Sequence, residues 1–337
     1  MDNDGELSVL CIGMMVADII AHPISTFDLS VDTTVVDNIQ VQCGGDALNA
    51  AIGLARLGVR TALAGKVGND AFGRFLVETV RGAGVDGSSL KIAEGESTGS
   101  VLVLVKGTGE RAFVYHGGTN DTLCEADVNA AALGEADIVH FGGVCLMPGL
   151  DGDGEVSILS RARERGKTTS MDVTWDPTGR WLDIVRPCLP HLDYFLPSLN
   201  EAKHIAGTDD PEQIAERLLE HGVGTVVVKL GSHGCYVRSA DEGFRLPACP
   251  VAQVVDTTGA GDAFLAGFLT GLSKRLPVRE CAELANAVGA MAVRAVGSTA
   301  GVTSFSDALD LMAAARAARA ARATRAARAA RTAGDER

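Results

Sequence analysis

The stretch from Val254 to Phe264 constrains the fold of this chain more than any other. It reads Val-Val-Asp-Thr-Thr-Gly-Ala-Gly-Asp-Ala-Phe, and a long apolar run from Ala263 to Leu272 follows. The β-branched pair favours an extended segment, the glycines favour a tight turn, and the apolar run has helical length. The sequence therefore predicts a strand that ends in a glycine turn and leads into a helix.

This glycine turn is suited to phosphate chemistry. The first turn of a helix has unpaired N–H groups and a positive partial charge, and glycine lets an anion approach them closely. We therefore expect the N–H groups of Gly259, Ala260 and Gly261 to bind phosphate oxygens. Asp262 adds one carboxylate, which either caps the helix or serves as a general base for an attacking hydroxyl.

A second glycine pair, Gly44-Gly45, precedes another predicted helix. The apolar residues of that helix recur with helical spacing at positions 48, 51, 52 and 55, and Asn49 lies in its first turns. Two glycine turns that lead into helices, both with polar groups beside them, indicate a site for two substrates.

The rest of the chain alternates between predicted strands and helices. Strands are expected at 8–13, 61–65, 137–141, 168–173, 193–196 and 224–230. Such alternation predicts an α/β fold, with a doubly wound, mainly parallel sheet flanked by helices. The carboxyl ends of these strands share one rim, where ligands bind. We expect Asp18, Asp172, Ser198, Gly231 and the Gly259 turn to meet there.

Two amphipathic regions, at about 22–43 and 96–118, interrupt the alternation. They predict a small separate β-sheet that covers the rim as a lid. Exposed lid strands invite pairing with a second copy of the chain, so we expect a homodimer through the lid.

Composition narrows the class of protein. The chain has 337 residues, of which 46% are hydrophobic, enough for one large domain over residues 1–310. Its net charge of −13 argues against nucleic acid as a partner. The eight cysteines form no CxxC pair, and the sequence has no signal peptide and no apolar segment of membrane-spanning length. We expect reduced thiols, no membrane association and a cytoplasmic location.

Residues 311–337 form an Ala/Arg-rich tail. Six arginines recur at every third position from Arg316 to Arg331. Three residues advance about 300° around a helix, so these arginines build no fixed face. The tail is predicted to be helical or disordered with almost nothing to bury; binding of an acidic partner is the alternative.

Residues 256–264 resemble the carboxyl-terminal signature of the PfkB (ribokinase-like) sugar kinases, and residues 44–49 with 65–73 resemble the amino-terminal one. The resemblance covers roughly residues 7–305. It implies a doubly wound core with a β lid, ATP with Mg²⁺ as phosphate donor, and a sugar or nucleoside hydroxyl as acceptor.

The resemblance also assigns roles by position. Asp262 matches the catalytic base, and the Gly259, Ala260 and Gly261 N–H groups match the anion hole. The positions that match acceptor-binding residues are Asp18, Gly44, Gly45 and Asn49. Those that match the nucleotide side are Lys229, Gly231, Asn286 and Gly297. Asp256 and Thr258 match positions that often bind a monovalent cation such as K⁺.

Two segments depart from the family pattern. Ser198 stands where asparagine is usual, while Glu201 is in place to hold Mg²⁺ through water. In residues 172–181, Asp172 and Arg180 are expected near the acceptor or the transferred phosphate. The equal alternative is a structural loop with a packed Trp181.

The hypothesis from sequence is an ATP-dependent kinase for a hydroxyl of a small sugar or sugar acid. A nucleoside kinase is the alternative among enzymes, but the lid strands offer only Phe27, Phe113 and Tyr115 as a slot for a base. Asp46 stands where ribose-specific members often have lysine, which argues against plain ribose. A non-catalytic sugar- or nucleotide-sensing protein is the alternative outside enzymes, and the intact Gly-Ala-Gly-Asp turn argues against it.

Overall fold

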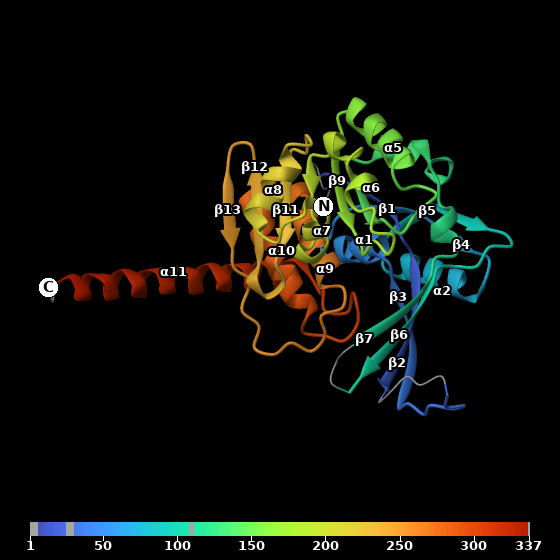
Figure 1. Ribbon diagram of the computed structural model, residues 1–337, viewed down its shortest axis with the longest axis horizontal. Helices are drawn as coiled ribbons and strands as arrows, with labels where there is room; N and C mark the ends of the chain where they lie inside the picture. The colour runs from blue at the N-terminus through green and yellow to red at the C-terminus, as the bar shows by residue number, and fades with distance from the viewer. Residues whose placement is uncertain (1–5, 25–29, 108–110, 336–337) are drawn as a thin grey trace.

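The computed structural model describes residues 6–24, 30–107 and 111–335, with the side chains of 322–335 omitted. Phe27 lies outside the described residues. The described chain builds a nine-stranded sheet in the order β13-β12-β11-β10-β9-β8-β1-β4-β5, parallel except at β12 and β13 (Figure 1). Its strands are β1 Val9–Gly13, β4 Thr61–Gly68, β5 Asp86–Ala93, β8 Ile138–Val144, β9 Thr168–Val173, β10 Tyr194–Phe195, β11 Thr225–Lys229, β12 Cys235–Ser239 and β13 Gly243–Leu246.

Helices cover both faces of this sheet. The reason is visible in β1, where Val9 and Cys11 pack into one apolar cluster and Leu10 and Ile12 into another. The first cluster lies under α1 Asp46–Arg56, α2 Ala71–Gly82, α9 Ala260–Ser273 and α10 Val278–Ala292. The second lies under α4 Ala130–Glu135, α5 Asp153–Glu164, α7 Leu199–Ala206 and α8 Pro211–Leu219. The doubly wound prediction is confirmed.

Shorter helical segments complete the connections. They are α3 Thr119–Thr122, α6 Leu182–Val185, η1 Glu125–Asp127, η2 Leu189–His191 and η3 Gly231–His233. Aspartates cap two of the helices: the Asp70 carboxylate accepts a hydrogen bond from the Gly73 N–H (2.7 Å), and Asp210 caps α8, which begins with Pro211.

A separate small sheet projects from the core, as predicted (Figure 1). Its strands are β2 Val16–Ile24, β3 Asn38–Gly44, β6 Ser100–Lys106 and β7 Arg111–His116, in the order β3-β2-β6-β7. β2 begins only three residues after β1 ends. Asp18, expected at the rim after this core strand, therefore lies in β2 of the small sheet, which begins earlier than the expected residue 22.

The strand register shows which residues share a face of the small sheet. Asp18 pairs with Val101, and Val101 pairs with Tyr115, so Asp18 and Tyr115 point to the same side. Phe113 and Arg111 follow on that side at intervals of two residues along β7. The other face exposes apolar side chains, namely Ile39, Val41 and Val114.

The structure differs from the sequence prediction before α9 and at the edges of the large sheet. Val254 and Val255 lie in an exposed loop rather than in a strand. The edge strands β5, β12 and β13 were not predicted. β5 begins Asp-Gly-Ser-Ser and is half exposed, so it lacks the apolar run of a central strand.

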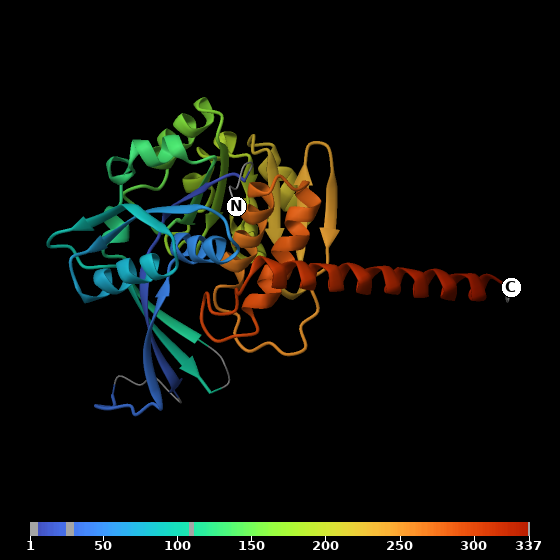
Figure 2. The same ribbon diagram turned by 180° about the vertical axis from the view of Figure 1, so that it is seen from behind.

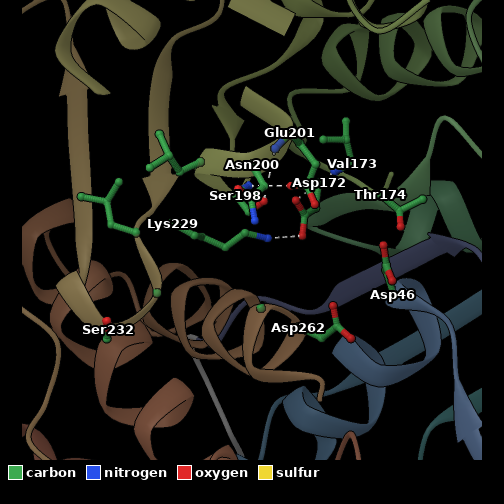
Figure 3. Close-up of a pocket in the computed structure, with 14 residues that line it drawn as sticks. Asp46, Asp172, Val173, Thr174, Ser198, Asn200, Glu201, Lys229, Ser232 and Asp262 are labelled. Atoms are coloured by element: carbon green, nitrogen blue, oxygen red, sulfur yellow. Dashed lines mark hydrogen bonds and ion pairs between the residues drawn. The ribbon is translucent and has the colours of Figure 1, made fainter. Parts of the chain in front are cut away.

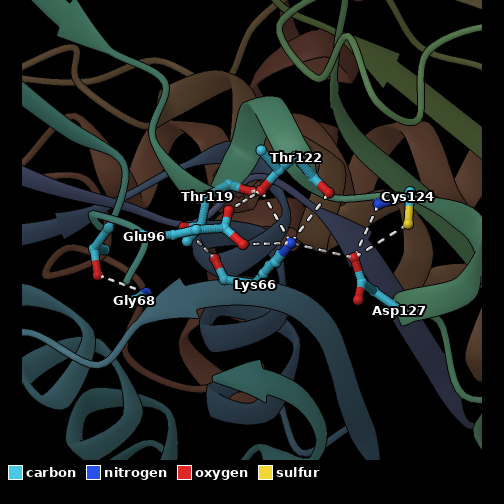
Figure 4. Close-up of polar contacts among 8 residues, drawn as sticks. Lys66, Gly68, Glu96, Thr119, Thr122, Cys124 and Asp127 are labelled. Atoms are coloured by element: carbon cyan, nitrogen blue, oxygen red, sulfur yellow. Dashed lines mark hydrogen bonds and ion pairs between the residues drawn. The ribbon is translucent and has the colours of Figure 1, made fainter. Parts of the chain in front are cut away.

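Lys66, near the end of β4, anchors the chain where it returns from the small sheet (Figure 4). Its ammonium donates to the carbonyl and hydroxyl of Thr122 (3.2 and 3.0 Å) and pairs with Glu96 (3.1 Å) and Asp127 (3.7 Å). The Thr119 hydroxyl donates to the Lys66 carbonyl at 2.8 Å. This cluster fixes the base of the small sheet to the core.

The carboxyl-terminal helix α11, Phe305–Asp335, extends away from the body of the molecule (Figures 1 and 2). The boundary expected at residue 310 falls inside it. Its first turns bury Ala308, Met312 and Ala315, and both Arg316 and Arg319 bind Glu283 of α10. The expectation that the Ala/Arg-rich tail has almost nothing to bury was therefore wrong for its first part, where Met312 and Ala315 are buried. Among the described residues, no helix has the length and apolarity to cross a membrane.

Candidate active site

A cavity of about 500 Å³ lies at the carboxyl ends of β9, β10 and β11 (Figure 3). The start of α1 and the first turn of α9 close its other side. It is lined by Asp46, Asp172, Val173, Thr174, Ser198, Leu199, Asn200, Glu201, Lys229, Leu230, Gly231, Ser232, Gly261 and Asp262. The fold thus brings both glycine turns and the predicted rim residues of three strands to one place.

The glycine turn before α9 has no room for a side chain. Gly259 has a φ of +69°, and a Cβ on it would lie 2.1 Å from the Ser298 carbonyl oxygen. The Ala260 N–H already donates to the Thr257 carbonyl, at the long distance of 3.3 Å. A phosphate oxygen would compete with this carbonyl for the N–H group. Gly261 borders the cavity, in the first turn of α9.

Asp262 is held by Asn49 across the two glycine turns. The Asn49 amide donates to Asp262 Oδ2 at 2.8 Å, and Asn49 Oδ1 lies 3.1 Å from the Ser298 hydroxyl. Burial raises the pKa of Asp262 to about 7, against the lowering effects of Asn49 and Lys229. Such a carboxylate can accept a proton near neutral pH. Asn49, predicted as an acceptor ligand, thus orients the carboxylate predicted as the base.

The other predicted acceptor residues form the junction between the small sheet and α1. A Cβ on Gly44 would lie 2.4 Å from an Asp18 carboxylate oxygen. One on Gly45, where φ is +93°, would lie 2.5 Å from the Met14 carbonyl oxygen. The glycine pair therefore lets β3 approach Asp18 and lets the chain turn directly into α1, where Asp46 lines the cavity.

Lys229 and Asp172 form a buried ion pair with an Nζ–Oδ2 distance of 2.5 Å (Figure 3). The sequence had placed Lys229 on the nucleotide side and Asp172 on the acceptor side, without predicting their contact. Burial lowers the pKa of Lys229, but the Asp172 and Glu201 carboxylates outweigh this and hold it above its usual value. Lys229 is therefore a cation, next to Gly231 in the lining.

Ser198 and Glu201 cap α7 reciprocally. The Ser198 N–H donates to Glu201 Oε2 at 2.7 Å, and the Glu201 N–H lies 3.5 Å from the Ser198 hydroxyl oxygen. Both residues line the cavity. The Ser198 hydroxyl, expected to stand in for asparagine in a metal–water network, serves first as the helix cap.

Two predicted nucleotide residues lie outside the cavity lining. Asn286 is buried in α10, and its amide nitrogen lies 3.5 Å from the Cys235 sulfur. The Gly297 N–H donates to Asp256 Oδ2 at 2.9 Å. Their contact with a nucleotide remains a prediction.

Arg111, which the sequence analysis missed, binds the oxygens expected to hold a monovalent cation. Its guanidinium donates to the Asp256 carboxylate and the Thr258 hydroxyl. Burial acts to raise the pKa of Asp256, but hydrogen bonds from Gly297, Thr258 and Arg111 hold it at about 2. Arg111 belongs to no motif, and only the placement of β7 reveals its role.

Residues 172–181 were expected either to contact the acceptor or the transferred phosphate, or to form a structural loop. Each expectation holds for part of the segment. Asp172 lines the cavity, whereas the Arg180 side chain lies in an exposed turn, where its Nε is 3.3 Å from the Thr178 hydroxyl. Trp181 is buried, with its ring centroid 5.0 Å from that of His204 and 5.2 Å from that of Trp175. The packed-loop interpretation holds for Trp181, and Arg180 stays outside the cavity lining.

Comparison with known proteins agrees with this geometry. Residues 6–304 match the model of the pfkB family of carbohydrate kinases. The chain is 31% identical over 281 residues to 2-dehydro-3-deoxygluconokinase of Bacillus subtilis, covering 80% of this chain and 82% of the relative. It is 28% identical over 304 residues to probable fructokinase-7 of Arabidopsis thaliana, covering 85% and 87%.

Solved structures share the fold. Arabidopsis thaliana ribokinase, solved with ribose and ATP, superposes with a TM-score of 0.79 at 25% identity, covering 91% of this chain and 99% of that one. A putative ribokinase II from E. coli, solved with ATP and Mg²⁺, gives 0.77 at 25% identity with the same coverage. These findings indicate a phosphotransferase that uses a sugar hydroxyl as acceptor. The chain belongs to the pfkB family of carbohydrate kinases.

Proposed function

We propose that this protein transfers the terminal phosphoryl group of ATP to a hydroxyl of a small sugar, with Asp262 as the general base. One observation carries the proposal: Asp262 lies in the same helical turn as the glycine N–H groups, and burial raises its pKa to about 7. A base and an anion site are thus adjacent, as phosphoryl transfer to a hydroxyl requires.

The two substrates would enter from opposite sides of this turn. The acceptor would lie against Asp18, Asp46 and Asp262, and ATP along the Lys229–Gly231 segment. The ammonium of Lys229 and the N–H groups of the Gly259 turn would face charge on the phosphates.

The residues at the nucleotide side fit a magnesium ion. Glu201 and Asn200 supply oxygen ligands of the kind that Mg²⁺ takes directly or through water, and both line the cavity. When bound with ATP, the ion would neutralise charge on the phosphates. Glu201 would hold its waters with the carboxylate oxygen that does not cap α7.

We also propose that the protein is a homodimer through the small sheet. The outer face of that sheet exposes Ile39, Val41 and Val114, with exposed fractions of 64%, 44% and 56%. Such an apolar patch fits burial against its own copy. Sedimentation of the wild type and of a Val41→Lys variant tests the dimer.

The eight cysteines are all free thiols, which supports the predicted cytoplasmic location.

A coupled ADP-release assay tests the function. The purified protein would be supplied with ATP, Mg²⁺ and panels of neutral sugars, sugar acids and nucleosides. We expect ADP release with at least one sugar, well above the ATPase background of an Asp262→Asn variant. Turnover with nucleosides alone, or with no acceptor, would contradict the proposal.

A further inference from the structure

The acceptor side of the cavity is strongly acidic. Asp46 and Asp262 line the cavity on this side, and Asp172 lines it next to Lys229. Asp18 lies beside Gly44 at the entrance to α1. Lys229 is the one cation among the lining residues, and its ammonium is bound to Asp172. A negatively charged acceptor would therefore meet an excess of like charge.

The carboxylates differ in whether the protein supplies them with hydrogen-bond donors. Asp262 accepts from Asn49, and Asp172 accepts from Lys229. Within the described parts of the chain, no donor contacts the side chains of Asp46 or Asp18. Both are partly buried, and an ionised carboxylate only accepts hydrogen bonds. Both residues keep part of their surface exposed, so hydroxyl donors of a ligand can reach these acceptors.

The arginines that could bind an acidic acceptor are engaged elsewhere. The guanidinium of Arg111, on the face of the small sheet that carries Asp18, is taken by Asp256 and Thr258. Arg180 contacts Thr178 in an exposed turn. Recognition of a carboxylate or phosphate generally uses such a guanidinium or a free ammonium.

The ionisation of the acceptor side agrees with this picture. Burial raises the pKa of Asp18 to about 6. Burial and then the charge of Asp262 raise the pKa of Asp46 well above its usual value. The raised pKa values show that negative charge is already unfavourable on this side of the cavity, before a substrate is bound.

From these contacts we infer that the acceptor is a neutral, hydroxyl-rich sugar, and that Asp46 selects it against sugar acids and sugar phosphates. The inference rests on the proposed function, since it concerns the acceptor side of the same cavity. Asp46 would accept hydrogen bonds from hydroxyls of the sugar, next to the hydroxyl that faces Asp262. Figure 3 shows the two carboxylates close together at that side.

Matched pairs of acceptors test the inference. We would compare kcat/KM for D-glucose with D-gluconate, for D-fructose with fructose 6-phosphate, and for both neutral sugars with 2-dehydro-3-deoxygluconate. At pH 8 we expect kcat/KM for the best neutral sugar to exceed that for the best anion by about 100-fold, since like charges that face each other at an interface repel. An anion as the best acceptor would overturn the inference.

An Asp46→Asn variant then tests the residue. Loss of hydrogen bonds to a charged group should lower kcat/KM for the neutral sugar about 10-fold or more and narrow the neutral-to-anion ratio. Asp241→Asn, in the exposed turn between β12 and β13, is the matched control and should change neither value. An unchanged ratio in Asp46→Asn, with an unchanged melting temperature, would overturn the role of Asp46.

A binding measurement separates this inference from the proposed function. Both tryptophans of the chain, Trp175 and Trp181, follow Thr174 of the cavity lining, so their fluorescence can report acceptor binding. If no acceptor turned over, the proposed function would fail. The ratio of the Kd of the neutral sugar to the Kd of its anionic partner would still decide the inference. Equal or tighter binding of the anions would overturn it.

Discussion

Arg111 and Asp256, 145 residues apart in the sequence, join the small sheet to the turn that precedes α9. Arg111 begins β7, and Asp256 also accepts hydrogen bonds from the N–H groups of Thr258 (2.9 Å) and Gly297 (2.9 Å). The guanidinium thus lies between a strand that covers the acceptor side and the loop that leads to Gly259. The position of the strand and the shape of the anion-binding turn are therefore linked.

An Arg111→Ala variant should become dependent on potassium. Without the guanidinium, Asp256 and Thr258 present oxygens with no cation, which a monovalent ion can bind. We expect kcat/KM to fall about 10-fold or more in buffer with only bulky organic cations, in line with the loss of a hydrogen-bonded charge partner. Potassium should restore part of the loss, whereas the wild type should respond little to it.

The control for this experiment is Arg245→Ala. Arg245, in the edge strand β13, forms an exposed ion pair with Glu212 (3.4 Å), and its loss changes the net charge equally. It should leave kcat/KM and the potassium response unchanged. A wild type that needs potassium, or an Arg111→Ala variant that ignores it, would show that the guanidinium does not take the place of the cation.

Asp262→Asn should abolish most turnover and keep ATP binding. The amide cannot accept the hydroxyl proton, and general bases contribute about 10²- to 10⁴-fold to rate. We expect kcat to fall within this range while the Kd for ATP, measured by calorimetry, changes less than about threefold because Asp262 faces the acceptor. Asp183→Asn, at an exposed position of helix α6, is the control. Near-normal kcat in Asp262→Asn would remove Asp262 from the role of base.

The local parts of this site were predictable, whereas the contacts between distant residues were not. Gly44-Gly45, Gly259 and Gly261 act through their own backbone geometry, which leaves a mark in the sequence. The pairing of Asn49 with Asp262 spans 213 residues and depends on how α1 and α9 pack, a relation that no spacing encodes.

The start of the small sheet at Val16, earlier than the expected residue 22, has a similar cause. Only Met14 and Met15 separate β1 from β2, so Gly13, the last residue of β1, is the single turn signal at the passage from the large sheet to the small one. The sequence shows an apolar run that continues past Gly13, and it does not show that the second strand pairs with β3 and β6. Which sheet a strand joins is decided by its partners, which lie tens of residues away.

Asn49→Leu should shift the pH dependence of turnover. The Asn49 amide stabilises the ionised form of Asp262 and lowers its pKa against the effect of burial. The base works in its ionised form, so kcat/KM should fall as the pH drops through about 7 in the wild type. Without the amide, that limb should move to higher pH by roughly one unit, the equivalent of one hydrogen bond.

The measurement is a pH profile of kcat/KM from pH 5.5 to 9.5. Ser298→Ala is the matched control, because its hydroxyl lies near Asn49 Oδ1 and does not contact Asp262. Ser298→Ala should shift the pH at which kcat/KM falls on the acidic side less than Asn49→Leu does. If Asn49→Leu lowered activity equally at every pH, Asn49 would bind substrate without tuning the base.

Glu155→Gln should stabilise the protein at neutral and alkaline pH. Glu155 is fully buried in α5, where its Oε2 accepts a hydrogen bond from the Gly152 N–H at 3.1 Å. Burial, followed by the charge of Asp151, raises the pKa of Glu155 well above 4.5. The folded state therefore binds this proton more tightly than the unfolded state does, and stability declines as the pH rises above about 4.5 toward the raised value.

A neutral glutamine keeps the acceptor for Gly152 and carries no charge to bury. We expect the variant to gain about 1 kcal/mol in the free energy of unfolding at pH 8, with the gain disappearing near pH 4. Urea unfolding at intervals from pH 4 to 9 measures it, with Glu164→Gln at the exposed end of the same helix as control. A gain that did not vary with pH would mean that packing, and not ionisation, sets the effect, because the two proteins differ in ionisable groups only at position 155.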